Sequence, residues 1–280
     1  MSSPIRLPYF DALLKLLDEG HPVLEQVFGH HVHWGYWPEP KRATGTPEDF
    51  AQAAEALSRL VYQAAGVADG MRVLDAGCGF GGTTASLNAN FERMALAGLN
   101  IDPRQLERAG SRIQARPGNT LEWIEGDACA LPFEDASLDA VLAVECIFHF
   151  PSRERFFREA FRVLKPGGRL ALSDFLPTVG LKPFIGLAGM WPATLGFYGR
   201  CDFRHGLEDY RRLAQSTGFA VRCERDITQE TLPTYDFIRK LAKEFTLPSV
   251  SAAAETLFAE WASRWGVLRY RVLGFEKAGG

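Results

Sequence analysis

The sequence predicts an α/β fold with a mostly parallel sheet and helices on both of its faces. Two observations lead to this prediction. Between about residues 71 and 175, short apolar segments typical of buried strands alternate with amphipathic helical segments. The first of these strands, residues 71–75, runs directly into a loop with four glycines in six positions, Gly77–Gly82. Such a loop favours a tight turn, so the chain leaves the sheet there.

The individual elements follow from the same alternation of apolar and amphipathic segments. In the core we expect strands at 71–75, 94–99, 121–124, 138–144 and 169–175, separated by helices at about 81–90, 103–115 and 152–163. Before the core, residues 8–28 and 47–66 are expected to be helical; after it we expect a helix at 206–217 and strands at 219–227 and 270–275.

Two intervals, 176–204 and 231–266, do not fit this alternation. Ligands of open parallel sheets bind at the carboxyl ends of the strands, so we interpret both as insertions that form a lid there. The predicted organisation is an N-terminal helical cap (1–66), a cofactor-binding core (67–175), a lid insertion (176–204), a continuation of the core (205–230), a helical lid insertion (231–266) and a last core strand (267–280).

The composition excludes several classes of function. The chain has 280 residues, 46% hydrophobic and 23% charged, which suits one globular core with a cap. A net charge of −3 without a basic aromatic run argues against nucleic acid as a partner. Five cysteines without C-x-x-C spacing, and an N-terminus unlike a signal peptide, suit a reducing cytoplasm. The most apolar stretch, Phe184–Tyr198, is too short for a membrane span, which leaves a peripheral membrane contact open.

The acid before the first glycine bears on which cofactor is bound. Gly77, Gly79 and Gly82 fit G-x-G-x-x-G, a pattern that also binds dinucleotides through their pyrophosphate. A carboxylate at Asp75 would repel that anion, and it favours a phosphate-free ligand with a cationic amine, such as S-adenosylmethionine. The glycines alone leave a nicotinamide-dependent dehydrogenase open, and a cofactor-binding scaffold without activity is a further alternative.

Polar residues also follow the second and third predicted strands. Asn100, Asp102 and Gln105 stand where a residue can hydrogen-bond the ribose hydroxyls of a bound nucleoside, and Ile101 lies between them at the same cofactor site. Asp102, followed by a proline, is explained equally well as a helix cap. Asp127 and Ala128 stand where a carboxylate and a backbone N–H can bind adenine, although a Gly-Asp pair alone is more often a plain turn.

Four segments together resemble the class I S-adenosylmethionine-dependent methyltransferases: Val73–Gly82, Gly98–Pro103, Gly126–Phe133 and Leu164–Gly168. Two more, Gly29–Trp37 and Glu145–Pro151, are similar to tocopherol, sarcosine/dimethylglycine and antibiotic-sugar methyltransferases. The resemblance implies a Rossmann-like sheet and a cofactor site made of Asp75, Gly77, Gly79, Gly81, Asn100, Ile101, Gln105, Asp127, Ala128, Glu145 and Tyr36. The family usually carries an acid where Asn100 stands.

The reaction centre is expected after the fourth strand. Methyl transfer needs alignment of the partners and removal of the acceptor's proton. His149 has a suitable side chain for a general base, and Asp174, at the end of the neighbouring strand, could orient it; the resemblance to sugar O-methyltransferases implies the same two roles. A histidine that only forms part of the pocket wall is the alternative. Glu145 could instead hold a cationic acceptor or act as base for carbon methylation.

The expected acceptor is a small, apolar or aromatic molecule methylated at a hydroxyl oxygen, with an amine or a prenylated quinone methylated at nitrogen or carbon as the alternative. The residues expected to contact it are Trp34, Cys146, Met190, Trp191, Phe197 and Tyr198, with additional polar contacts from Tyr210, Tyr235 and Arg239. His30, His31 and His33 lie too close together in sequence to define a metal geometry without a carboxylate or thiol partner, so we expect no metal.

Overall fold

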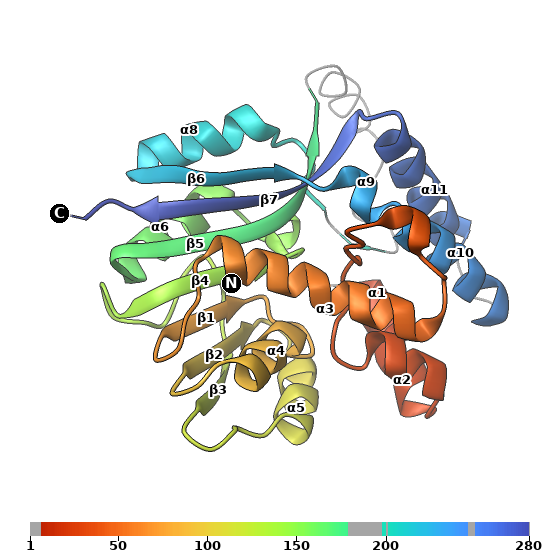
Figure 1. The fold of residues 1–280 in the computed structure, drawn as a ribbon, viewed down its shortest axis with the longest axis horizontal. Helices are drawn as coiled ribbons and strands as arrows, with labels where there is room; N and C mark the ends of the chain where they lie inside the picture. The colour runs from red at the N-terminus through yellow and green to blue at the C-terminus, as the bar shows by residue number, and fades with distance from the viewer. Residues whose placement is uncertain (1–6, 179–197, 200, 246–249, 280) are drawn as a thin grey trace.

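A computed structural model describes residues 7–178, 198–199, 201–245 and 250–279, which form one seven-stranded sheet in the order β3-β2-β1-β4-β5-β7-β6 (Figure 1). Neighbouring strands from β3 to β5 are parallel, and β7 is antiparallel to both β5 and β6. The strands are β1 (Arg72–Ala76), β2 (Ala95–Asn100), β3 (Thr120–Glu125), β4 (Leu138–Val144), β5 (Leu164–Pro177), β6 (Phe219–Asp226) and β7 (Leu268–Lys277). The predicted α/β fold class is confirmed.

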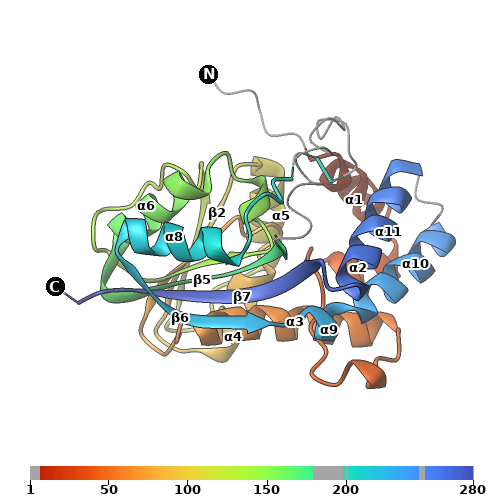
Figure 2. The same ribbon diagram turned by 90° about the horizontal axis from the view of Figure 1, so that it is seen from above.

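Helices cover both faces of this sheet, as the alternating sequence predicts (Figure 2). One face packs against α3 (Pro47–Ala64) and α4 (Gly82–Asn90), and the other against α6 (Arg153–Val163) and α8 (Leu207–Thr217). Consecutive residues of a strand point to opposite faces of the sheet. Val73 therefore packs in the hydrophobic cluster under α3 and α4, and Leu74 in the cluster under α6 and α8. Helix α5 (Pro103–Arg112) packs against β2 and the edge strand β3.

The predicted N-terminal helix at 8–28 is two helices in the structure, α1 (Pro8–Asp18) and α2 (Pro22–Phe28). Gly20 interrupts it with a φ of +76°, a conformation that favours glycine, and Pro22 then begins the second helix without needing a backbone donor. The predicted continuous helix is therefore wrong at this turn. Strand β5 also begins earlier than expected, at Leu164, because Leu164 pairs with Leu138 before the register shifts.

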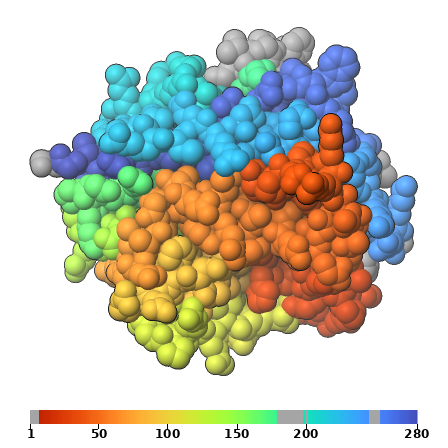
Figure 3. Space-filling view, viewed as in Figure 1, coloured from red at the N-terminus to blue at the C-terminus, as the bar shows by residue number. Residues whose placement is uncertain are grey.

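The remaining helices gather where the parallel strands end. There α1 and α2 approach α9 (Thr228–Thr231), α10 (Pro233–Phe245) and α11 (Val250–Arg264) (Figure 1). In the space-filling view the orange N-terminal residues lie directly against the blue C-terminal ones (Figure 3). Two short 3₁₀ turns, η1 (Pro40–Arg42) and η2 (Ile147–His149), lie in the connecting loops. None of the helices in the described ranges combines the length and apolarity that crossing a bilayer requires.

The strand order reverses at β1, because β1 pairs with β2 on one side and β4 on the other. Asp75 lies opposite Gly98 of β2 and Leu142 of β4, so these three strands end at the same level. The loops after them diverge to opposite faces and leave a crevice between them. In open α/β sheets this is the usual position of a ligand.

Prediction for the glycine loop. A Cβ atom at Gly81, where φ is +81°, would lie 2.6 Å from the Trp123 ring and 2.7 Å from Ile113. We expect Gly81→Ala to lower the free energy of unfolding by about 1–2 kcal/mol for the positive φ and by a further ~1–3 kcal/mol for the overpacking. Gly118 is the matched control, since its φ is +89° and no atom would lie within 4 Å of a Cβ atom there. Equal losses in urea unfolding for the two variants would contradict the packing argument.

Candidate active site

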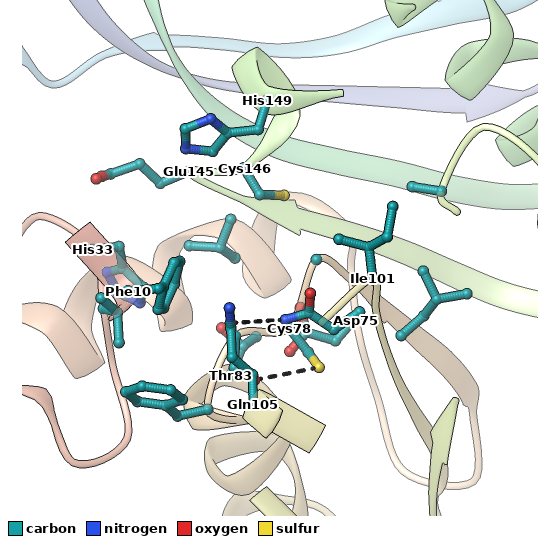
Figure 4. Close-up of a pocket in the computed structure, with 18 of the residues that line it drawn as sticks. Phe10, His33, Asp75, Cys78, Thr83, Ile101, Gln105, Glu145, Cys146 and His149 are labelled. Atoms are coloured by element: carbon teal, nitrogen blue, oxygen red, sulfur yellow. Dashed lines mark hydrogen bonds between the residues drawn. The ribbon is translucent and has the colours of Figure 1, made fainter. Parts of the chain in front are cut away.

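A pocket opens at the carboxyl ends of β1, β2 and β4, with an empty volume of about 860 Å³ that includes its mouth (Figure 4). It brings together residues from four separate strand ends and from the N-terminal loop at 30–33. The predicted site residues that line it are Asp75, Gly77, Gly79, Asn100, Ile101, Gln105, Asp127, Ala128, Glu145, Cys146 and His149. Residues up to 144 positions apart in the chain, from Leu7 to Pro151, therefore share one cavity.

Asp75 ends β1 with its carboxylate inside the protein and only 2% of the residue exposed. Thr84 Oγ1 donates a hydrogen bond to Asp75 Oδ2 at 2.9 Å. Burial raises the pKa of this carboxyl to about 6, against the opposing effect of the Thr84 hydrogen bonds. No cation among the described residues pairs with it. The pocket thus contains a carboxylate that a cationic ligand would stabilise.

The glycines of the loop differ in what a Cβ atom at each position would contact. A Cβ atom at Gly79 would point into open space, with Gln105 Oε1 the nearest atom at 3.9 Å, so this glycine leaves room in the pocket. At Gly77 it would lie 2.8 Å from Cys146 Sγ, which shows how closely the loop approaches the exit of β4. Gly81 does not line the pocket; it makes room for Trp123, so its predicted cofactor role is corrected to packing.

The strand-end side chains of β2 and β3 are organised by their own hydrogen bonds. Asn100 Nδ2 donates to Gln105 Oε1 at 3.0 Å, which couples the two amides expected at the ribose. Asp102 accepts from Arg104 N and caps α5, so the helix-cap interpretation is confirmed. Ile101 is 40% exposed at the pocket, and Asp127 Oδ1 accepts from Cys129 N at 2.8 Å. An exposed apolar side chain between two polar groups suits the face of a nucleoside base.

Glu145 begins the exit from β4 in a left-handed conformation with φ +50°, uncommon for a non-glycine residue. Its Oε2 accepts hydrogen bonds from Trp34 N at 3.0 Å and from the Tyr270 hydroxyl, while its own N–H donates to Ser173 Oγ. Burial raises the pKa of Glu145 to about 8, although those two hydrogen bonds oppose the shift. The group therefore keeps its proton at neutral pH in the absence of a cation.

The N-terminal loop is held over the pocket by a buried hydrogen-bond network. His33 Nδ1 donates to Trp34 O at 2.9 Å, so its Nε2 is an acceptor, and burial lowers the pKa of His33 to about 3. His31 Nε2 lies 3.1 Å from Glu55 Oε2, and His31 Nδ1 lies 3.1 Å from His33 Nε2. Ser58 Oγ lies 3.1 Å from His33 Nε2 and joins the same network.

Glu55 completes this network from α3. Burial raises its pKa, but hydrogen bonds from His31, Ser86 and Arg59 outweigh that effect and lower the pKa to about 2. A charged Glu55 therefore faces His31 from behind the pocket wall. In the described part of the chain no three His, Cys, Asp or Glu side chains are grouped as a metal site.

Asp174 does not contact His149. It is fully buried, and its Oδ2 accepts from Arg153 Nη2 at 3.0 Å and from the Tyr210 hydroxyl, while Oδ1 accepts from Phe175 N. Arg153, itself 2% exposed, also donates to Asp202 O at 2.7 Å. Both carboxylate oxygens are thus occupied, and the predicted role of Asp174 as the group that orients His149 is corrected to a buried ion pair behind the site. Tyr210 belongs to this ion pair and not to an acceptor site.

His149 ends η2 at the pocket, above Glu145 and Cys146 in Figure 4. Its ring stacks on Tyr9 with centroids 6.1 Å apart and an interplanar angle of 22°, and it meets Phe148 edge-on at 4.5 Å. The Cys201 thiol lies 3.8 Å from His149 Nδ1. The imidazole is therefore held between aromatic rings at the end of the cavity nearest Glu145.

Three of the residues expected at the acceptor are described by the structure, and two of them lie beside the pocket. Trp34 packs edge-on against Phe175 and Tyr235, both at 5.6 Å, and Tyr198 shares a hydrogen bond with Thr256 at 2.9 Å. Neither lines the cavity; Cys146 does, and its thiol donates to Ala76 O. Met190, Trp191 and Phe197 lie outside the described residues.

Three further expectations are corrected by hydrogen bonds within the protein. Tyr36 packs its ring against the Arg225 guanidinium at 5.3 Å, and its hydroxyl accepts from the same residue, away from the cofactor pocket. The Tyr235 hydroxyl is paired with Ser263 at 3.0 Å. Arg239 forms ion pairs with Glu260 and Asp236. These side chains support the helices around the site.

Several pocket residues were not anticipated from the sequence, because no motif marks them. Phe10 and Tyr9 reach the cavity from α1, and Phe80 and Thr83 from the glycine loop and α4. Thr83 alone carried a signal, since it directly follows the glycines at the start of α4, where backbone N–H groups are unpaired. The α1 residues are brought there only by long-range packing.

The chain is similar to known methyltransferases. A family profile described as "Methyltransferase domain" matches residues 74–172. Methyltransferase GfsG of Streptomyces halstedii is 31% identical over 223 residues, which covers 78% of this chain and 76% of the relative. 27-O-demethylrifamycin SV methyltransferase of Amycolatopsis mediterranei is 38% identical over 171 residues, covering 60% and 57%.

Among solved structures, geranyl diphosphate C-methyltransferase from Streptomyces coelicolor A3(2), in complex with Mg²⁺, geranyl-S-thiolodiphosphate and S-adenosyl-L-homocysteine, aligns with a TM-score of 0.74. The alignment covers 99% of this chain and 100% of that chain at 20% identity. Identity at this level establishes the common fold only.

Prediction for Asp174. Replacing Asp174 with Asn leaves the Arg153 guanidinium buried without its closest counter-charge. We expect the free energy of unfolding to fall by about 3–5 kcal/mol, measured by urea denaturation. Asp202→Asn is the control: this carboxylate lies 3.6 Å from the same arginine but is partly exposed, so a smaller loss is expected. A folded Asp174→Asn protein with wild-type stability would contradict the ion-pair assignment.

Prediction for Asp75. A folded-state pKa of about 6 exceeds the ordinary value of 3.8, so the folded protein loses stability as the pH rises from about 4 to about 6, and the full cost of the ionised carboxylate is present above pH 6. We expect Asp75→Asn to raise the free energy of unfolding at pH 8 by up to about 3 kcal/mol, without a change at pH 4.

The same variant should lose stabilisation by S-adenosylmethionine, because its ammonium would meet an uncharged amide. Urea unfolding at pH 4 and pH 8, with and without the ligand, measures both effects. A variant that is less stable than the wild type at both pH values and responds normally to the ligand would contradict this account.

Proposed function

This chain belongs to the S-adenosylmethionine-dependent methyltransferases, and from that premise we propose that it methylates a hydroxyl oxygen of a small, largely apolar acceptor, with His149 as general base. The observation that carries this proposal is that a single cavity contains the cofactor residues of β1, β2 and β3 together with His149. The base therefore lies at the edge of the same space that holds the methyl donor.

Methyl transfer requires the protein to align the methyl donor with the acceptor and to remove one proton from the acceptor. When bound, S-adenosylmethionine supplies a methyl group made electrophilic by its sulfonium. With the cofactor bound, Asp75 would hold the methionine amine, the Asn100 and Gln105 amides would hold the ribose, and Asp127 with the Ala128 N–H would hold adenine. His149 would take the proton of the acceptor hydroxyl as the oxygen–carbon bond forms and the carbon–sulfur bond breaks, which leaves a neutral thioether. The aromatic rings of Tyr9 and Phe148 fix the orientation of His149.

The apolar character of the acceptor is proposed from the side chains around His149. Tyr9, Phe10, Phe80 and Phe150 line the same cavity as His149, and Tyr9 stacks on the imidazole, so the surroundings of the base are aromatic. Such surfaces select for aromatic or hydrocarbon groups and exclude water from the reaction. A small molecule rather than nucleic acid fits this environment and the net charge of −3.

The reducing cytoplasm that we propose as the site of action is supported by the cysteines. All five are free thiols in the structure.

Carbon methylation is the second candidate, because Glu145 lies beside His149 with a pKa raised to about 8. A carboxyl with such a pKa can accept a proton from carbon at alkaline pH, where it is ionised, or stabilise a developing cation in that form. The geranyl diphosphate C-methyltransferase with the same fold makes this chemistry a reasonable comparison. The hydrogen bonds of Glu145 to Trp34 and Tyr270 favour a structural and electrostatic role over that of the base.

Prediction for the base. We expect His149→Ala to lower kcat by about 10²–10⁴ while the Kd for S-adenosylmethionine, measured by isothermal titration, stays within about twofold. Glu145→Gln is the matched control: it keeps the hydrogen-bond acceptor, and we expect less than a tenfold loss of kcat if the acceptor atom is oxygen. The acceptor is found first, by a panel of phenols, sugars, amines and prenyl quinones with labelled cofactor.

The reverse pattern, with a small loss for His149→Ala and a large one for Glu145→Gln, would transfer the role of base to Glu145 and favour carbon methylation. A wild-type protein that binds NAD and not S-adenosylmethionine would overturn the proposed function as a whole.

A further inference from the structure

Helix α11 exposes its large apolar side chains to solvent, whereas an ordinary surface helix buries them. Its largest apolar side chains face outward: Leu257, Phe258, Trp261 and Trp265 are 53%, 57%, 51% and 73% exposed. Its inward face carries polar residues instead, including Thr256 at 7%, Glu260 at 6% and Ser263 at 2% exposure. A helix that packs against a protein core normally shows the opposite arrangement.

The inward polar residues Thr256 and Ser263 of α11 form hydrogen bonds with tyrosines near the site. Thr256 shares a hydrogen bond with the Tyr198 hydroxyl, and Ser263 with the Tyr235 hydroxyl at 3.0 Å. Tyr235 in turn packs edge-on against Trp34, whose backbone N–H holds Glu145. The helix is therefore fixed by polar contacts on the side of the reaction centre, and its outer face is free to serve another purpose.

The outer face forms one continuous aromatic surface. Phe258 stacks on Trp261 with centroids 6.2 Å apart, and Trp261 lies 6.1 Å from Trp265, as residues three and four positions apart on a helix do. Between residues 253 and 265 the exposed side chains are apolar except for Arg264, which pairs with Glu260 and with Asp236 of α10, and Glu255 is half-buried. We call Leu257, Phe258, Trp261 and Trp265 the aromatic face of α11.

We propose that the aromatic face of α11 docks the enzyme onto the surface of a lipid bilayer, from which an apolar acceptor is drawn. Tryptophan and phenylalanine prefer the boundary between headgroups and acyl chains. Arg264 beside them is paired with Glu260 and with Asp236, so the proposed contact depends on the four apolar side chains and not on charge. The inference rests on the proposed function in one respect, since only an apolar acceptor is concentrated in lipid.

A second copy of the chain is the less suitable occupant. Aromatic side chains bury about 150–250 Å² each when fully covered, so four half-exposed residues offer roughly 400–500 Å². A stable protein interface needs about 800 Å² from each partner. Shallow insertion into a bilayer has no such threshold, because its strength grows with each apolar side chain that is buried.

The test is co-sedimentation of the full chain with phosphatidylcholine vesicles, with and without phosphatidylglycerol, in the absence of cofactor and acceptor. We expect the wild type to bind both kinds of vesicle, and the double variant Trp261→Gln and Trp265→Gln to bind at least about tenfold more weakly. The matched control is Val221→Gln on β6, which removes another exposed apolar side chain, 38% exposed, and should leave vesicle binding unchanged.

Thermal unfolding confirms that each variant is folded. Wild-type protein that fails to bind either vesicle, or a double variant that binds as well as the wild type, overturns the proposal. So does analytical ultracentrifugation that shows a wild-type dimer converted to a monomer by the double variant, because the face would then bind a second copy. The binding assay contains no substrate, so its failure leaves methylation of a soluble acceptor, and the proposed function, intact.

Discussion

The structure depends on how three carboxyl groups at the ends of adjacent strands are compensated, two of them buried and the third, Glu145, half-buried. Asp75 ends β1, Glu145 follows β4 and Asp174 lies near the end of β5, and desolvation raises the pKa of all three. Among the residues that the structure describes, a cation pairs with Asp174 alone, and that cation is Arg153. An ionised carboxylate without such a partner is costly in the protein interior. The pocket between β1 and β4 is therefore prepared for a ligand that brings positive charge.

This constraint explains the surrounding architecture. The ion pair of Asp174 lies on the side of the sheet that Arg153 and Tyr210 close, so it stabilises the fold without reaching the cavity. Glu145 faces the cavity and is held by Trp34 N, which links it to the N-terminal loop and its histidine network. The cap thus closes the pocket through hydrogen bonds to the very carboxylate that a cationic cofactor would ionise.

The sequence predicted the sheet, the order of its core elements and eleven of the residues in the pocket, because strand-end motifs report local geometry that the parallel sheet then brings together. The sequence predictions were wrong or incomplete where packing between distant segments determines which side chains meet. Asp174 and His149 are close in strand order, yet Arg153, 21 positions upstream, takes the carboxylate. Tyr9 and Phe10 reach the cavity from α1, and no periodicity marks which α1 residues do so. The break between α1 and α2 does have a sequence signal, because the Gly-x-Pro pattern at Gly20–Pro22 favours the end of one helix and the start of another.

The central claim is that the ligand supplies the charge that the pocket lacks, and proton release on binding tests it most directly. Titration calorimetry at pH 7 in buffers of different ionisation enthalpy counts the protons exchanged. Glu145, with a pKa of about 8, is mostly protonated at that pH, so S-adenosylmethionine should release about one proton and S-adenosylhomocysteine, which lacks the sulfonium charge, clearly fewer. Equal or negligible proton release for the two ligands would contradict the account.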